Sequence, residues 1–106
     1  MATIEDFKKL EIIVAQIKEV KDHPNADRLY VLKVDTGKEE KQLVAGIRQA
    51  YSKEPLVGRQ IVMVNNLEPA TLRGVASFGM LLAASDGDSL TLVVPERPIS
   101  LGAVVR

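Results

Sequence analysis

A serine lies between two glycines in the segment Gly74–Gly79, and its neighbourhood superficially suggests two motifs that do chemistry. A nucleophile elbow requires Gly-x-Ser-x-Gly, but Gly74 stands one residue too far before Ser77. A phosphate-binding P-loop requires Lys and then Ser or Thr after its second glycine, whereas Met80 and Leu81 follow Gly79. Both spacings fail. Ser77 is therefore either a turn residue that satisfies local backbone groups or a hydroxyl presented to a ligand.

Residues that could bind a metal ion are scarce. His23 is the only histidine and there is no cysteine, so a zinc site of the usual nitrogen and sulfur type is not expected. His23 precedes Pro24 in an expected loop, which favours a role in organising that turn over a role as base or ligand. Asp86–Asp88 could open a calcium loop, but Arg97 stands where its final Glu belongs, with Pro95 inside. We expect a turn there, and no metal or cofactor.

The composition is that of an ordinary globular protein, and it gives no sign of binding to polyanions. Its 106 residues suffice for one domain, placed here at residues 1–106, and 46% of them are apolar. The 14 Lys and Arg balance 14 Asp and Glu, whereas proteins that grip phosphates usually carry a basic excess. No apolar run approaches the roughly 20 residues that span a bilayer. Met1–Asp6 lacks a signal-peptide pattern, so we expect a cytoplasmic protein.

The apolar pattern predicts an all-β chain with short helices. Thr3 and Asp6 resemble a capping box that begins an N-terminal helix, and residues 47–54 could hold a second helix closed off by the next proline. A change of phase near residues 15–16 predicts a bulge in a long, bent first strand. We expect strands at residues 11–22, 30–35, 41–45, 60–64, 80–84 and 90–94, with a last short one at 100–105.

The order of these elements favours an OB-fold Greek-key barrel with a C-terminal extension, because one helix separates the third and fourth strands. The pattern alone leaves other small barrels open. A long loop is expected at residues 65–79, between the fourth and fifth strands. Asn66 in this loop has the same two interpretations as Ser77, because Asn tolerates left-handed turns.

Aromatic residues are too few for a protein that binds single strands by stacking. The four are Phe7, Tyr30, Tyr51 and Phe78. Tyr30 lies in the apolar phase of its strand and Phe7 on an amphipathic helix, so we expect both in the core. Only Phe78 lies in a plausible binding loop. Nonspecific single-strand binding, which uses exposed aromatic faces, therefore fits poorly.

Several blocks, in order and at matching spacing from about Ile4 to Arg106, resemble the structure-specific tRNA-binding domain family. The matching segments are Asp6-Phe7, His23–Tyr30, Val34–Gly37, Gln42–Ile47, Asn66–Gly74 with Ser77, Gly79 and Met80, and Asp86–Asp88. This family occurs at the C-terminus of many methionyl-tRNA synthetases, as free-standing proteins, and in endothelial-monocyte-activating polypeptide and tRNA-binding cofactor proteins. The resemblance implies an OB barrel, often a homodimer, that binds the outer corner of tRNA by shape without base-specific discrimination.

The resemblance also assigns tRNA contacts by position, to Asn66, Arg73, Ser77 and Met80. Arg73 can form charge-assisted bonds to phosphate, and Asn66 and Ser77 can reach phosphate or ribose oxygens. Met80 can offer a soft apolar contact. Lys33 and Lys41 are candidates for flanking phosphate contacts from neighbouring strands.

Four positions depart from the family pattern. Glu68 and Thr71 stand where the family usually has Lys, so the basic patch is smaller here. Ile13 and Ala15 stand where the family favours Arg and Gly. The fold is unaffected by these changes, but each lost phosphate contact would lower the salt dependence of binding by roughly one unit.

The leading hypothesis is a tRNA-binding module that assists a methionyl-tRNA synthetase in cis or in trans by raising the local concentration of tRNA. The alternative is a chaperone-like or protein-interaction homodimer on the same barrel. No catalytic spacing was found, so an enzyme is not expected. Residues 90–105 carry more apolar side chains than a trailing edge needs, which predicts a homodimer joined there.

Overall fold

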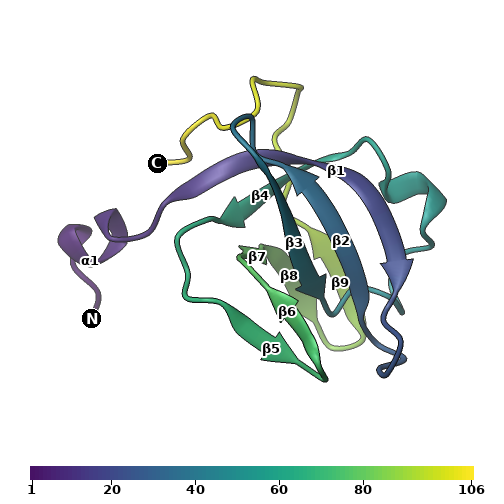
Figure 1. The fold of residues 1–106 in the computed structure, drawn as a ribbon. Helices are drawn as coiled ribbons and strands as arrows, with labels where there is room; N and C mark the ends of the chain where they lie inside the picture. The colour runs from purple at the N-terminus through teal and green to yellow at the C-terminus, as the bar shows by residue number, and fades with distance from the viewer.

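Five antiparallel strands form the main sheet, in the order β3-β2-β1-β4-β7, and curl into a nearly closed barrel (Figure 1). The computed structural model describes residues 1–106. The strands of the sheet are β1 Ile12–Asp22, β2 Tyr30–Asp35, β3 Glu40–Ala45, β4 Gln60–Val64 and β7 Met80–Leu81. Two hairpins accompany them, β5 Ala70–Leu72 with β6 Val75–Ser77 and β8 Ala83–Asp86 with β9 Ser89–Leu92. The prediction of an all-β OB barrel is confirmed.

The long strand β1 belongs to both halves of the barrel. Its first half pairs with β4, from Ile12 opposite Val64 to Gln16 opposite Gln60, and its second half pairs with β2. The register with β2 slips between Ile17 and Glu19, which places a bulge at the exposed Lys18. A bulge bends a strand and increases its twist, so β1 can cross from one half of the barrel to the other.

The bulge was predicted near residues 15–16 and lies two residues later. Ile13 and Ile17 both point into the main core, so the alternation continues unbroken to Ile17. Ile12 is buried as well, but in a separate small cluster with Val62 and Val64. Burial on both faces of β1, which the sequence pattern does not distinguish from a change of phase, caused the misplacement.

The predicted helix at residues 47–54 is wrong. The nearest helical element is the 3-10 turn η1, Glu54–Leu56, whose second residue is the proline expected to terminate the helix. Proline is favoured in a first helical turn because its missing N–H has no partner there in any case. Ile47 and Leu56 are both buried and complete the core at this end of the barrel.

The expected long loop at residues 65–79 contains the β5–β6 hairpin, and the strand expected at 80–84 divides into β7 and the start of β8. The last predicted strand, 100–105, is reduced to a single bridge between Val104 and Ile13. This C-terminal segment still lies along β1, because the N–H of Gly102 donates to the carbonyl of Val14 at 2.7 Å.

The helix α1, Ile4–Lys8, begins with the predicted capping box, in which Thr3 and Asp6 each accept the backbone N–H of the other. The expectation that Phe7 lies in the core is wrong. None of the residues of α1 is buried, and the helix projects from the barrel (Figure 1). Neither α1 nor η1 is long and apolar enough to cross a membrane.

Candidate nucleic-acid interface

The β5–β6 hairpin is held on the barrel beside β3 by bonds that involve Ser77. Its hydroxyl accepts the backbone N–H of Val44 at 2.9 Å and donates to the carbonyl of Gly79 at 3.0 Å. Next to it, the N–H of Phe78 donates to the carbonyl of Gln42. The serine side chain therefore satisfies a strand N–H where β3 and β6 form no backbone ladder.

Ser77 does not present its hydroxyl to a ligand in this structure. The residue is only 4% exposed, and its hydroxyl is engaged as both donor and acceptor. Of the two interpretations that the sequence left open, satisfaction of backbone groups is the one observed. Ser77 therefore has a structural role where β6 meets β3, and the tRNA contact assigned to it by resemblance stays a prediction.

Asn66 is exposed, but both ends of its side chain are bound within the chain. Its Oδ1 accepts the N–H of Glu11 at 2.7 Å, and its Nδ2 donates to the carbonyl of Lys9 at 2.8 Å. The neighbouring Asn65 adds a side-chain bond to the Glu11 carboxylate at 2.6 Å. These two asparagines fix the direction in which α1 leaves the barrel. Asn66 thus positions the N-terminal arm, a role that the sequence pattern did not indicate.

Arg73 occupies the tip of the hairpin in a backbone conformation that is unusual for its type. It is the only residue other than glycine with a positive φ, 52°, and Gly74 follows at 89°. Two positive φ values in a two-residue turn between paired strands define a type I′ turn, which prefers Asn, Asp or Gly. For other residues the left-handed conformation costs roughly 1–2 kcal/mol. Such strain persists only where surrounding contacts impose it.

Those contacts come from the loop between β1 and β2, residues 23–29, which lies beside the hairpin tip (Figure 1). The Nδ2 of Asn25 donates to the carbonyl of Arg73 at 3.2 Å, and Nη2 of Arg73 donates to the carbonyl of Asn25 at 3.0 Å. His23, 3% exposed, donates from Nε2 to the carbonyl of Leu72 at 2.8 Å. His23 organises this loop, as expected from its place before Pro24.

Lys33 and Lys41 project from β2 and β3 but differ in availability. Lys33 lies 3.4 Å from the carboxylate of Glu19, which Lys21 also approaches, so two cations share one anion. Lys41 is half-buried and donates from Nζ to the carbonyl of Asn65 at 2.9 Å. A phosphate could draw Lys33 from a solvent-screened pair at little cost, whereas Lys41 would have to give up an internal bond.

Apolar side chains are exposed next to these cations. Met80 on β7 is 51% exposed and Phe78 is 41% exposed. Phe78, Leu67 and Pro69 line a hollow of about 370 Å³ together with the polar residues Glu39, Glu40, Lys41 and Gln42. The surface around the hairpin therefore mixes soft apolar contacts with single cations and lacks a dense basic patch.

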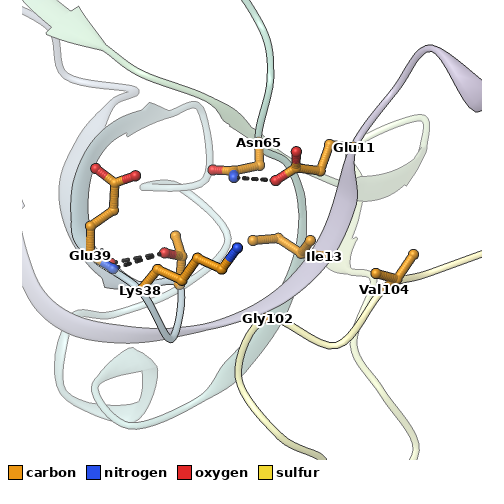
Figure 2. A pocket seen from close by; sticks show the side chains of 8 residues that line it. Glu11, Ile13, Lys38, Glu39, Asn65, Gly102 and Val104 are labelled. Atoms are coloured by element: carbon orange, nitrogen blue, oxygen red, sulfur yellow. Dashed lines mark hydrogen bonds between the residues drawn. The ribbon is translucent and has the colours of Figure 1, made fainter.

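A second hollow, of about 310 Å³, lies where the start of β1, the β2–β3 turn and the C-terminal segment meet (Figure 2). The carboxylates of Glu11 and Glu39 line it, with Lys38 as the only cation. Two carboxylates repel phosphate, so this hollow is a poor site for nucleic acid. Val104, 71% exposed, lies at its edge. No three His, Cys, Asp or Glu side chains gather anywhere in the structure as they would around a metal ion.

One ionisable group has a clearly displaced pKa, and it lies among other elements. The hydrogen bond between the hydroxyls of Tyr51 and Thr91 lowers the pKa of the Tyr51 phenol below its ordinary value of 10.0, and the N–H of Leu92, which donates to the phenol oxygen, adds to the effect. Tyr51 thereby joins the segment after β3 to β9. The charge of Arg59 also lowers the pKa of the phenol, whereas burial opposes the shift.

Residues 12–104 match a family model described as "Putative tRNA binding domain". The chain is 54% identical over 101 residues to methionine–tRNA ligase of Nanoarchaeum equitans, covering 95% of this chain and 13% of that ligase. The ligase of Thermotoga maritima is 47% identical over 103 residues, covering 97% of this chain and 16% of that protein. The chain thus spans only a small part of the curated relatives that it matches.

Two solved structures are similar to this chain over its whole length. A MetRS-related protein from Pyrococcus horikoshii superposes with a TM-score of 0.93 at 31% identity, covering 100% of this chain and 98% of that chain. The chaperone CsaA from Bacillus anthracis superposes with a TM-score of 0.92 at 28% identity, covering 100% and 99%. Both likenesses extend over the whole barrel and its terminal segments.

Proposed function

The chain belongs to the tRNA-binding domain family, and from this membership we propose that it recognises the shape of folded tRNA without base-specific readout. It would assist a methionyl-tRNA synthetase, in cis or in trans, and carry out no catalytic turnover itself. The observation that carries the proposal is Arg73, a cation held in a strained conformation at the tip of an exposed hairpin. A strained residue kept at an exposed tip is typical of a ligand contact.

The distribution of aromatic residues supports recognition of shape over recognition of bases. Tyr30 is buried, and its hydroxyl donates to the carbonyl of Tyr51. Phe78 is the only exposed aromatic residue beside the hairpin, since Phe7 lies on the projecting helix. One stacking platform is too few to read a series of unpaired bases, so contacts to phosphate and ribose must dominate.

Direct contacts are proposed for Arg73, Met80 and Lys33, which are exposed. Lys41 is proposed as a weaker contact, because its amine is already bound to a carbonyl. Asn66 is proposed to act by fixing the direction of the N-terminal helix. Its amide could reach a ribose only by breaking its bonds to the backbone of Lys9 and Glu11. These roles rest on exposure and bonding together with the positions that the family resemblance assigns.

The test is a gel-shift titration of a folded tRNA transcript over a series of salt concentrations. Plain RNA duplex and single-stranded RNA of equal length serve as competitors. We expect the folded tRNA to be displaced only by itself, and the logarithm of affinity to fall linearly with the logarithm of salt. Equal competition by the duplex would overturn recognition of shape, and absence of a shift at low salt would overturn tRNA binding.

The assistance to a synthetase is proposed on the basis of effective concentration. A module that holds tRNA beside a catalytic domain turns the second encounter into an intramolecular one. Aminoacylation by a methionyl-tRNA synthetase catalytic domain would therefore show a lower KM for tRNA when this chain is fused to it. An Arg73→Ala fusion serves as the matched control. An unchanged KM in the active fusion would refute assistance in cis, and the same assay with separate chains tests assistance in trans.

We also propose a homodimer, in which residues 90–105 take part as the sequence suggests. Val93, Val94, Ile99 and Val104 are each 39% exposed or more in the single chain. The helix α1 adds Phe7, with 40% exposed, and Ile4 to the unburied apolar surface. Monomeric proteins rarely expose this much apolar surface, and association with a second copy would remove it from water.

The second candidate function is a chaperone-like protein that binds apolar segments of other proteins. It is favoured by the exposed Leu67, Phe78 and Met80 around the hairpin and by the likeness to chaperone CsaA. Competition decides between the candidates. If an unfolded model protein displaces tRNA and binds more tightly at moderate salt, the chaperone-like function is primary.

A further inference from the structure

A third hollow, of about 360 Å³, lies between the 23–29 loop and the tip of the β5–β6 hairpin. Its lining residues are Asn25, Ala26, Asp27, Arg28, Leu29 and Arg73. Two guanidinium groups thus come from separate parts of the chain, one from the loop and one from the turn. Nothing in the family resemblance assigned a role to Arg28.

The two arginines differ from those cations of the chain that lie in ion pairs. Lys21 and Lys33 share the carboxylate of Glu19, and Arg48 and Lys53 share that of Asp22. Arg28 and Arg73 form no ion pair with any carboxylate. Their charge is therefore free to act on a ligand.

The side chain of Arg28 makes no hydrogen bond inside the molecule, whereas its backbone carbonyl accepts the N–H of Arg48. Arg28 is exposed, so its guanidinium is hydrated until a ligand arrives. Arg73 has one internal bond, from Nη2 to Asn25, which leaves its other guanidinium donors free. Arginine suits phosphate because its planar group can donate two parallel bonds.

The loop that carries Arg28 is anchored before any ligand binds. The N–H of His23 donates to the carbonyl of Leu29 at 3.2 Å, and Nη1 of Arg48 donates to the carbonyl of Ala26 at 3.3 Å. Nδ1 of His23 accepts the N–H of Asn25 at 2.9 Å. Its proton must therefore lie on Nε2, which donates to Leu72 of the hairpin. One imidazole thus connects both walls of the hollow.

We propose that this hollow is a phosphate-binding site, in which Arg28 and Arg73 together contact the ribose-phosphate backbone of an RNA. His23 and Asn25 are positioning residues that hold the two walls in register. The inference rests on the proposed function, because it names the group of the RNA that the hairpin tip takes. Asp27 is the one carboxylate that lines the hollow. It repels an anion and therefore weakens the binding of phosphate.

The decisive variant is Arg28→Ala, measured by tRNA gel shift over a salt series. Because the Arg28 side chain has no internal bond, its removal leaves the loop intact, which amide chemical shifts of residues 23–29 would verify. We expect about tenfold weaker binding at low salt, as for a lost charge-assisted contact. The slope of affinity against salt should fall by about 0.7–0.9, as for one lost phosphate. Arg28→Lys should retain the slope but lose part of the affinity.

The matched control is Arg97→Ala. Arg97 is also an exposed arginine, but it lines a different hollow beside Gly58 and Pro98 and lies 4.0 Å from Glu96. We expect this variant to bind within twofold of the parent. Asp27→Asn provides a test of opposite sign, because removal of the carboxylate should tighten binding about threefold.

The positioning role is tested by a double-mutant cycle. Asn25→Ala should lower both affinity and salt slope in the parent, yet change neither further in an Arg73→Ala background. Additive effects would show that Asn25 acts elsewhere. If Arg28→Ala binds like the parent while Arg73→Ala is weakened, the phosphate site is overturned and the proposed function stands. If the parent binds no tRNA, the proposed function itself falls.

Discussion

The hairpin region, formed by β5, β6 and the 23–29 loop, and the terminal region, formed by α1 and residues 93–105, expose different chemistry. In the hairpin region, backbone groups are joined by side chains of His23 and Asn25, and two arginines remain without carboxylate partners. In the terminal region, Ile4, Phe7 and Val104 lie exposed around a barrel edge. The first surface suits a charged, hydrated ligand and the second suits an apolar partner.

The difference between these two regions shows that the net charge of a small barrel does not predict which ligands it binds. The chain has as many acidic as basic residues. Two of its anions, Glu19 and Asp22, are each paired with two cations, and Glu11 and Glu39 line the hollow at the start of β1. Local arrangement leaves the hairpin tip cationic in a neutral molecule, and binding energy depends on that local field.

The largest expected effect belongs to the terminal region. Val104→Asp should weaken the proposed dimer by roughly 2 kcal/mol or more, because a charge would be buried at the apolar interface. Light scattering at micromolar concentration would show a monomer. Val57→Asp is the matched control, since Val57 is 52% exposed and follows η1. A parent chain that is already monomeric would refute the dimer.

The hairpin region is tested most strongly at its tip. Arg73→Ala should weaken tRNA binding by roughly 1–3 kcal/mol and reduce the salt slope by about one. The same change relieves nothing in the backbone, because Ala at a positive φ is strained as well. Arg73→Asn, which suits the turn and lacks the charge, separates the two effects. If it binds as tightly as the parent, the guanidinium is not a contact.

Stability distinguishes the seam of the hairpin region from its ligand surface. Ser77→Ala should lower the free energy of unfolding by about 1–3 kcal/mol, since the N–H of Val44 would lose its partner in a buried place. Urea denaturation measures this effect, with Ser85→Ala on exposed β8 as the control. A variant of unchanged stability and weakened tRNA affinity would instead support Ser77 as a direct contact.

The smallest expected effect sharpens the comparison by adding charge beside the hairpin. Glu68→Lys with Thr71→Lys should tighten tRNA binding about threefold to tenfold at low salt, because exposed charges contribute about 1 kcal/mol or less each. The salt slope should rise by up to about one unit for each lysine. Both positions are exposed, so the fold should be unaffected. Binding no tighter than that of the parent would place the tRNA surface elsewhere.

Most strands were predictable because their alternation is local. Tyr30, Leu32 and Val34 alternate with polar or half-buried neighbours, and all three are buried in the core as expected. The β5–β6 hairpin was missed because its turn signal is Arg73-Gly74 in place of the usual Asn-Gly. The strain at Arg73 is imposed by a loop far away in sequence, which no local pattern records.

The roles of individual site residues were less predictable than the strands. Asn66 bonds to Lys9 and Glu11, and Ser77 bonds to Val44. These partners are distant in the chain, so residue type alone could not separate an internal amide or hydroxyl from one offered to a ligand. Arg28 was overlooked because its charge becomes meaningful only when the hairpin brings Arg73 beside it.

The double membership of β1 has a consequence for the order in which the barrel folds. The pairing of β1 with β2 closes a short loop, whereas its pairing with β4 joins Ile12 to Val64, half the chain away. Loop-closure entropy favours the β1–β2–β3 meander as the early nucleus, with β4 and the terminal segment added later. Such non-local closure is typical of refolding over roughly milliseconds to seconds. Shortening the side chain of Val20 to Ala should therefore slow refolding. The same change at Val62 should mainly speed unfolding.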